Sequence, residues 1–350
     1  MASPHLARLG AVVVAAVLSV AARSQEPALR GLDPIALCAG NEEQGQVEFA
    51  TEHEGYVYRF ASKDRLAKFH AKPERYSIQL GGACARMGPH SGRGEAKRFW
   101  VYKEHIYIFA SDGCRAGFQK DPEACLGKRI PRPKAAGKPG FDAADRIAAA
   151  KKAHGLSTLP TFSFEVATTN GKTKTRRVFQ VRDANSVRVD TEYRQGDQVW
   201  KYAKATSPKA SFFIDEGDLR PMASAAQHEM RQVLWQEPIV ALSRCEHAVR
   251  GGKKTIAGID VTEVSVWIDG TLTHFGLDEK NLVRTARFLG RGPDFRFAEV
   301  TKIYDDLKDV GGVIVPHTVQ TLLGGKKQTE RRTKVTTGKA FAPGLFAPKK

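Results

Sequence analysis

Cysteine thiols are the side chains of this 350-residue chain that are best suited to chemistry. The chain has five of them: Cys38, Cys84, Cys114, Cys125 and Cys245. Deprotonated thiols bind soft metal ions such as Cu(I) or Zn(II) in preference to hard cations. In an oxidising compartment the same residues would instead pair as disulfides. Because their number is odd, at least one cysteine has no partner within the chain.

Cys114 is the best placed of these thiols. It follows Ser111, the expected N-cap of a helix, by three residues, and the partial positive charge of a helix N-terminus lowers the pKa of a thiol. Cys84 ends the glycine turn of residues 81–84, where glycine permits a close backbone approach to Cys114. We therefore predict a copper or zinc site built from Cys114, Cys84, Cys125 and Cys38. A structural disulfide between two of these four cysteines, or inert thiols, are the alternatives that the sequence leaves open.

A repeated segment must position these thiols. Seven residues recur at an offset of 49 positions: Tyr58, Phe60, Ala61, Ser62, Phe69, Pro73 and Glu74 return as Tyr107, Phe109, Ala110, Ser111, Phe118, Pro122 and Glu123. Such self-similarity is typical of a repeated supersecondary unit. Each copy predicts a strand, a serine N-cap, a short helix and a proline that ends the helix. Arg65 and Tyr76 of the first copy are replaced by Cys114 and Cys125 in the second.

The first 24 residues predict export. His5 and Arg8 precede an apolar run over residues 9–22, and small residues surround a cleavage site before Gln25. About 14 apolar residues are too few to span a bilayer, which takes about 20. We therefore expect the mature chain to be secreted, periplasmic or part of the cell envelope.

The charge of the chain indicates anionic partners. Fifty-five Lys and Arg residues against 38 Asp and Glu residues give a formal net charge of +17. Lipid headgroups, another anionic surface or an acidic protein fit an exported chain, whereas nucleic acid does not, because basic and aromatic residues are not interleaved. A solvated basic face without a specific partner is the alternative.

The composition divides the mature chain into two units. Residues 28–127 hold four of the cysteines, residues 128–141 form a basic linker rich in proline, and residues 142–346 form the larger unit. In the larger unit, apolar residues alternate with polar ones, and turns are expected at positions 170–171, 269–270, 311–312 and 324–325. Helices are expected over 142–154 and 222–235. The fold class is α+β: a small α+β unit with an internal repeat, then a large curved antiparallel sheet covered by helices.

Residues 31–127 resemble the YHS domain. The residues that carry this resemblance are the 31–36 segment (GLDPIA), the 55–62 segment (GYVYRFAS), Phe69, the 73–76 segment (PERY) and the 79–85 segment (QLGGACA). The second copy looks more like the short form of this domain found beside heavy-metal ATPases, which has a cysteine near its helix N-terminus. The resemblance implies binding of a heavy metal, copper among them, with Cys114 as a ligand. Cys38 is displaced from the position of the first cysteine in that short form.

Residues 142–346 resemble the half-barrels of the LolA and LolB lipoprotein carriers. The resemblance lies in the pattern of the helix at 143–155 leading into a strand, and in the segment 304–317. It implies a concave apolar face that could hold a lipid or lipoprotein chain. The predicted lining residues are Phe162, Phe164, Trp200, Phe212, Val266 and Phe297. The same residues would equally fill a closed core.

These observations predict an exported, non-enzymatic binding protein that holds a soft metal ion in its first unit and a lipidic or other apolar ligand, or a partner, in its second. Catalytic motifs are missing: the pair His228-Glu229 lacks the second histidine of a zinc protease, and no P-loop or Gly-x-Ser-x-Gly segment occurs. An envelope structural or interaction protein with a disulfide-braced first unit is the alternative. A copper-dependent oxidoreductase is a further alternative, and the sequence leaves the oligomeric state open.

Overall fold

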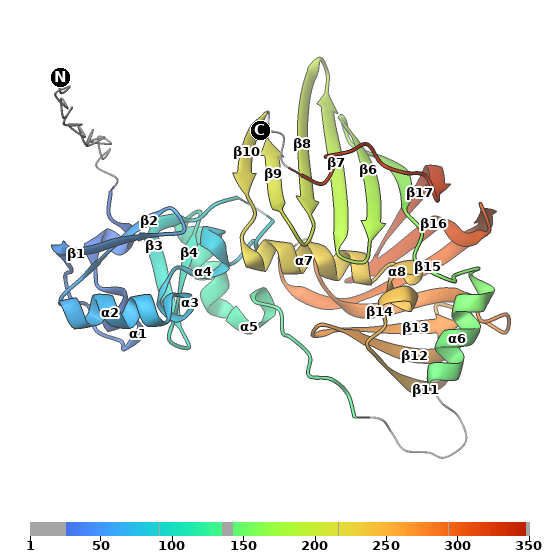
Figure 1. Ribbon diagram of the computed structural model, residues 1–350, viewed down its shortest axis with the longest axis horizontal. Helices are drawn as coiled ribbons and strands as arrows, with labels where there is room; N and C mark the ends of the chain where they lie inside the picture. Colours follow the sequence, from blue (N-terminus) through green and yellow to red (C-terminus); the bar gives the residue numbers. More distant parts are fainter. Residues whose placement is uncertain (1–25, 91, 135–142, 216, 293, 348–350) are drawn as a thin grey trace, which may run out of the picture.

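The computed structural model describes residues 26–90, 92–134, 143–215, 217–292 and 294–347. Two small sheets with short helices precede residue 128, in the predicted smaller unit, and one large sheet with its helices follows residue 142, in the predicted larger unit (Figure 1). The predicted export segment over 1–24 and the linker residues 135–141 lie outside the described residues. No helix of the described part is long and apolar enough to cross a membrane.

The first unit contains two copies of the predicted strand and helix segment. Its elements are η1 (Ala28–Gly31), α1 (Pro34–Cys38), β1 (Gln46–His53), β2 (Tyr56–Phe60), α2 (Lys63–Ala71), α3 (Pro73–Tyr76), η2 (Gln79–Gly82), β3 (Glu95–Tyr102), β4 (His105–Phe109), α4 (Asp112–Lys120) and α5 (Pro122–Cys125). Each copy has a two-stranded antiparallel sheet, β1-β2 or β3-β4. Ser62 and Ser111 cap α2 and α4 as predicted, because their hydroxyls accept from the backbone N–H of Arg65 and Cys114.

The repeat extends beyond the segment recognised in the sequence. The left-handed turn at Leu29, with φ of 58°, returns in η2 at Leu80, with φ of 57°. The backbone hydrogen bond from Gly45 to Gly31, at 2.9 Å, returns from Gly94 to Gly82, also at 2.9 Å. The offset is therefore 51 residues at η1 and η2 and 49 residues at the later positions.

The second unit is one antiparallel sheet of thirteen strands. Its strands are β5 (Phe162–Asn170), β6 (Thr173–Asp183), β7 (Ser186–Gln195), β8 (Gln198–Thr206), β9 (Ser211–Asp215), β10 (Asp218–Pro221), β11 (His247–Ile256), β12 (Ile259–Ile268), β13 (Thr271–Leu277), β14 (Val283–Arg291), β15 (Phe297–Val310), β16 (Val313–Leu323) and β17 (Lys326–Thr337). Their order in the sheet is β10-β9-β8-β7-β6-β5-β17-β16-β15-β14-β13-β12-β11. The first strand, β5, thus pairs with the last, β17.

All four predicted turns join consecutive strands of this sheet. Strand β15 begins at Phe297. Phe295 has a left-handed φ of 66°, and its N–H donates to the carbonyl of Gly292 in a turn.

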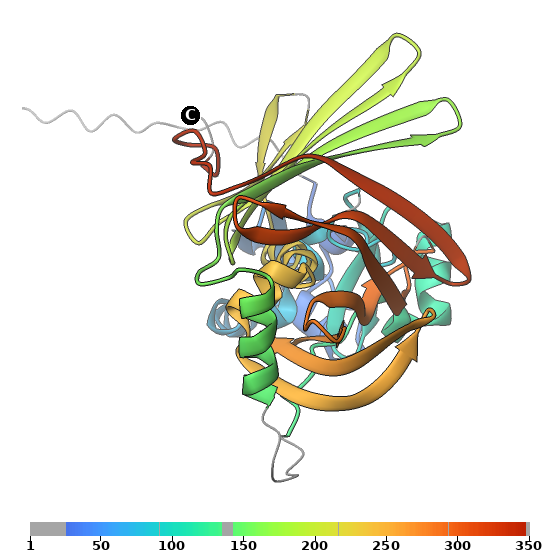
Figure 2. The same ribbon diagram turned by 90° about the vertical axis from the view of Figure 1, so that its right-hand side faces the viewer.

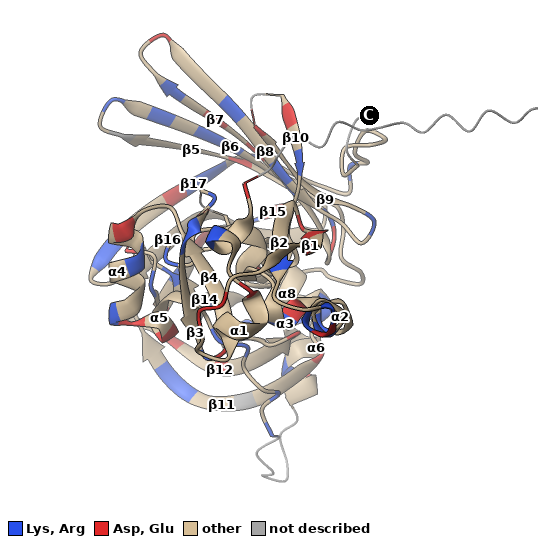
Figure 3. Ribbon diagram, turned by 90° about the vertical axis from the view of Figure 1, so that its left-hand side faces the viewer, with Lys and Arg blue, Asp and Glu red and all other residues tan. Residues whose placement is uncertain are grey.

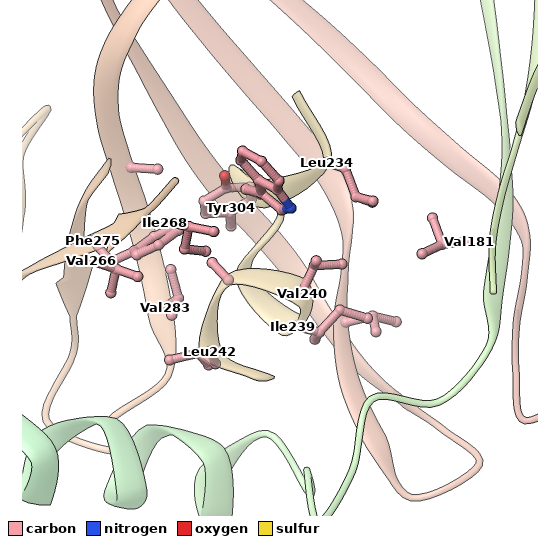
Figure 4. Packing of buried hydrophobic residues seen from close by; sticks show 14 of the residues in the cluster. Val181, Leu234, Ile239, Val240, Leu242, Val266, Ile268, Phe275, Val283 and Tyr304 are labelled. Atoms are coloured by element: carbon pink, nitrogen blue, oxygen red, sulfur yellow. The ribbon is translucent and has the colours of Figure 1, made fainter. Parts of the chain in front are cut away.

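Helices fill the concave side of the curved sheet. The segment between β10 and β11 forms α7 (Ser224–Trp235) and α8 (Pro238–Arg244), and the sheet wraps around this helical hairpin (Figure 2). α6 (Ala143–Ala153) packs against α8 and the β11-β12 end of the sheet. Figure 4 shows α8 surrounded by buried side chains from several strands, among them Val266, Phe275 and Tyr304. The large curved antiparallel sheet covered by helices is therefore confirmed.

The segment that connects the two units is hydrogen-bonded to the second unit. Residues 128–134 have no helix or strand, as expected for a linker, but they lie against the second unit. The N–H of Ile130 donates to the carbonyl of Gly270, and the carbonyl of Ile130 accepts from the indole of Trp267, both at 2.8 Å. η2 of the first unit also packs on α7 of the second.

Candidate functional site

The structure brings three of the predicted metal ligands into one small core. Cys84 and Cys125 are buried together with Phe109 and Phe118 in the second copy of the repeat, and Cys114 packs against this cluster. Cys38 lies in the separate core of the first copy, and Cys245 lies in the second unit. All five cysteines are free thiols, with no disulfide among them.

In the first copy of the repeat, the position that corresponds to Cys84 holds a buried anion. Asp33, at this position in the first copy, is fully buried. Its carboxylate accepts hydrogen bonds from the backbone N–H groups of Ile35, Ala36 and Ala61, at 2.7 to 3.1 Å. It also pairs with the guanidinium of Arg65 at 3.2 Å. Three backbone donors and one cation thus converge on a single buried anion.

Cys84 occupies the same place in the second copy. The N–H of Asp33 donates to the carbonyl of Glu43, and the N–H of Cys84 donates to the carbonyl of Gly92, at matching positions of the repeat. The Cys84 sulfur accepts hydrogen bonds from the backbone N–H groups of Arg86, Met87 and Ala110. These three residues are the counterparts of Ile35, Ala36 and Ala61. The second copy therefore keeps a cradle of backbone donors but places a thiol in it.

Cys114 stands where the first copy has Arg65. It is the third residue of α4, its N–H donates to the Ser111 hydroxyl at 3.1 Å, and its side chain is half-buried. Its side chain packs against the small core that contains Cys84. The buried carboxylate and guanidinium of the first copy are thus exchanged for two neighbouring thiols.

Burial and the backbone donors act in opposite directions on Cys84. Burial raises the pKa of the Cys84 thiol, the N–H groups of Ala110, Met87 and Arg86 lower it, and the nearby Cys114 thiol raises it, for a net increase. Burial also raises the pKa of Cys125, and that of Cys38 to about 11. These thiols carry their protons at neutral pH, so a soft cation that replaced the protons would be the charge that stabilises the thiolates.

The donor set decides which metal ion fits. In the part of the chain that the structure describes, no three side chains of His, Cys, Asp or Glu gather as ligands for a metal ion. Structural zinc takes four such ligands in a tetrahedron, and two thiols do not supply them. Cu(I) is a soft ion for which thiolates are the preferred protein ligands. The pair Cys84 and Cys114 therefore fits Cu(I) better than Zn(II).

The predicted apolar lining of the half-barrel is mostly packed core. Phe162, Phe164, Phe212 and Val266 are between 1% and 5% exposed. The cavity that remains beside Phe162 and Phe164, between α8 and β17, has a volume of about 10 Å³. The concave face is occupied by the α7-α8 hairpin.

Two predicted lining residues lie outside that core. Trp200 is 37% exposed near the start of β8, opposite Tyr193 of β7. Phe297 is half-buried at the boundary between the units, where the guanidinium of Arg291 lies 4.5 Å from its ring centre. The six predicted residues therefore do not form one pocket.

Comparison with known proteins gives no family for this chain. No family model and no curated protein sequence match it. A LolA superfamily protein from Nitrosomonas europaea is similar over 60% of this chain and 99% of that chain, with 11% identity and a TM-score of 0.34. LprF from Mycobacterium bovis is similar over 61% of this chain and 100% of that chain, with 8% identity and a TM-score of 0.26. The Pseudomonas aeruginosa MucA/MucB complex covers 60% of this chain and 62% of that chain, with 14% identity and a TM-score of 0.21.

Scores at this level do not identify a function. The resemblance of residues 31–127 to YHS domains also stays a prediction, because no family model matches this segment. The function proposed below accordingly depends on the geometry of this chain.

Proposed function

We propose that the protein is a non-enzymatic binding protein whose first unit holds a soft metal ion, Cu(I), between the thiolates of Cys84 and Cys114. The observation that carries the proposal is the exchange of Asp33 and Arg65 for these two cysteines at matching places in the repeat. In the first copy, a buried anion is neutralised by a side-chain cation. In the second copy, a bound metal ion would supply that cation.

The local charges support this arrangement. Two thiolates and one Cu(I) leave a net charge of −1, and backbone N–H donors to Cys84 and the positive end of α4 beside Cys114 would stabilise it. Cys84 is 0% exposed, so a metal ion at its sulfur would be shielded from water and from competing ligands. Cys125 lies in the same cluster but is fully buried at the end of α5, and the proposal assigns it no direct role.

Competition between the protein and a Cu(I) chelator tests the proposal. We expect one Cu(I) per chain, and we expect Cys84→Ser or Cys114→Ser to weaken binding at least 100-fold, because a hydroxyl is a hard and weak ligand for this ion. Cys245→Ser is the matched control, since this half-buried cysteine belongs to the other unit. Equal losses for Cys114→Ser and Cys245→Ser would refute the site.

The repeat itself supplies a second control. The double variant Cys84→Asp with Cys114→Arg copies the pair that the first copy already accommodates at these positions. It should fold, as judged by circular dichroism, and bind no Cu(I). If it retained the affinity of the unsubstituted protein, the thiol pair could not be the binding site.

A second candidate function belongs to the half-barrel: holding a lipidic chain on its concave face after the α7-α8 hairpin moves away. The observation that favours it is a buried ion pair between the hairpin and the sheet, from Glu237 before α8 to Arg332 of β17, at 2.8 and 3.0 Å. A buried ion pair adds little net stability to an interface, because both charges regain water when the surfaces separate. Native mass spectrometry of the purified protein should then detect a bound lipid, and its absence after incubation with lipid would refute this candidate.

A further inference from the structure

The first unit has a cavity that is lined by none of its cysteines. Its volume is about 310 Å³, and it is bounded by η1, the end of α1, the strand β3 and α4. Arg30, Lys97 and Arg115 line it together with the rings of Phe99 and Trp100. Glu42 is the one carboxylate among the residues that line it. The cavity thus combines three cations with two aromatic rings.

The backbone at Arg30 points to a role for its side chain. Arg30 has a left-handed φ of 59°, a conformation that glycine adopts freely and that other residues rarely adopt. Its counterpart in the second copy is Gly81, with φ of 61°, which packs against Ala223 at the start of the α7 helix. The second copy uses glycine at this turn and is covered by the second unit. The first copy keeps an arginine there and leaves a cavity open beside it.

The cations of the cavity are weakly neutralised. Among the described residues, no carboxylate pairs with Arg30, whose Nε donates to the carbonyl of Lys97 at 3.2 Å. Its guanidinium lies 5.9 Å from the centre of the Phe99 ring. Arg115 pairs at 3.0 Å with Asp112, and Asp112 is 69% exposed, so water and salt screen this interaction.

We infer that this cavity binds a small aromatic anion, such as an aromatic carboxylate or sulfonate. The acidic group pairs with Arg30 and Arg115, where the planar guanidinium matches an oxyanion by two parallel hydrogen bonds. The ring packs against Phe99, whose own ring centre lies 5.9 Å from the Arg30 guanidinium, as aromatic pairs do. The inference does not depend on the metal site, because none of the cysteines lines this cavity.

Calorimetric titration with 1-naphthoate tests the inference, with 1-naphthalenemethanol as a probe that has the same rings and no charge. We expect naphthoate to bind at least tenfold more tightly than the alcohol, and its affinity to fall as salt is raised. Comparable affinities for the two probes, or no binding of naphthoate, would overturn the inference.

Arg30→Gly is the decisive variant because the second copy already carries glycine at this turn. Its melting temperature should equal or exceed that of the unsubstituted protein, because glycine adopts the left-handed conformation without strain. It should nevertheless bind naphthoate about tenfold more weakly. Lys63→Gln removes one exposed charge from α2, away from the cavity, and is the matched control. If Arg30→Gly and Lys63→Gln changed naphthoate binding equally, general charge attraction would explain the binding and the assigned site would be wrong.

Discussion

At the scale of single residues, the proposed site is a buried position whose backbone N–H donors stabilise a negative charge. Backbone N–H donors around Asp33 and around Cys84 are set by the same turn of the repeated unit. A carboxylate there is neutralised by Arg65, whereas a thiol can stay protonated until a soft cation replaces the proton. One exchange of residue type at each of two positions therefore converts a structural ion pair into a candidate binding site.

This account predicts how Cu(I) affinity depends on pH. Binding at Cys84 releases the proton of its thiol, so the apparent affinity should rise about tenfold per pH unit while that thiol is protonated. Burial raises the pKa of Cys84, and this extends the rise to higher pH than for an exposed thiol. In Cys84→Ser this contribution to the slope should be lost. Titrations against a chelator that does not itself titrate would measure the slope, and equal slopes for the variant and the unsubstituted protein would contradict binding at Cys84.

How far these residues were predictable depends on the offset of the repeat. Ser111 and Cys114 were found because they lie where the offset is 49 and where a serine cap leaves a clear signature in sequence. The correspondence of Cys84 with Asp33 was missed, since two residues fewer separate η2 from β4 than separate η1 from β2, which shifts the offset to 51. The pattern Leu-x-Gly at 29–31 and at 80–82 was the signal that could have found it.

At the scale of elements, the α7-α8 hairpin determines whether the concave face is open. Pro238 begins α8, where its missing N–H costs nothing. The alternation of apolar residues and the glycine turns predicted the strands, because these signals are local. The pairing of β5 with β17 and the place of the hairpin depend on contacts between distant segments, which no local pattern encodes.

The buried ion pair between Glu237 and Arg332 predicts how substitutions in the hairpin change the stability of the protein. Burial alone would raise the pKa of Glu237, but Arg332 and Lys302 hold it below its usual value, and the side chain of Arg332 is only 5% exposed. Glu237→Ala should cost about 3–5 kcal/mol, because it leaves Arg332 charged and unpaired in the core. The double variant Glu237→Met with Arg332→Met should be about as stable as the unsubstituted protein, or more so, since apolar contacts replace the pair.

The same variants distinguish the contribution of the hairpin to stability from its effect on lipid binding. Urea unfolding measures the free energy of unfolding, and native mass spectrometry measures bound lipid. If the hairpin is a cover that must move, the double Met variant should carry less lipid than the unsubstituted protein at equal or greater stability.

The lowered pKa of the Glu237 carboxylate also predicts a pH dependence. The stabilisation by its pair with Arg332 is present above about pH 4 and is lost as pH falls through the lowered pKa that Glu237 has in the folded protein. The double variant should not show that loss.

At the scale of the whole molecule, one arginine joins the two units. Arg291 of β14 donates to the Glu229 carboxylate of α7 at 2.9 Å and to the carbonyl of Cys125 in the first unit at 3.0 Å. Lys, Arg, Asp and Glu residues occur throughout both units (Figure 3), and the side chain of Arg291 is only 17% exposed. This contact ends at the cluster that contains Cys84 and Cys114, so the proposed metal site and the half-barrel share a physical link.

We expect Arg291→Ala to uncouple the two units. It removes the hydrogen bonds to Glu229 and Cys125 and leaves the partly buried Glu229 carboxylate without its cation, which should cost up to about 3 kcal/mol. Calorimetry should show a single unfolding transition for the unsubstituted protein and two for the variant. Arg129→Ala removes the exposed pair with Asp269 in the same region and should change stability by less than about 1 kcal/mol.

Adding Cu(I) to the Arg291→Ala variant then assigns the transitions. A ligand that binds only the folded state raises the stability of the unit that holds it, in proportion to the logarithm of its concentration. Cu(I) should therefore move only the transition of the first unit upward and leave that of the half-barrel unchanged. A shift of both transitions would mean that the units remain coupled without Arg291, through the packing of η2 on α7 and the bonds of Ile130.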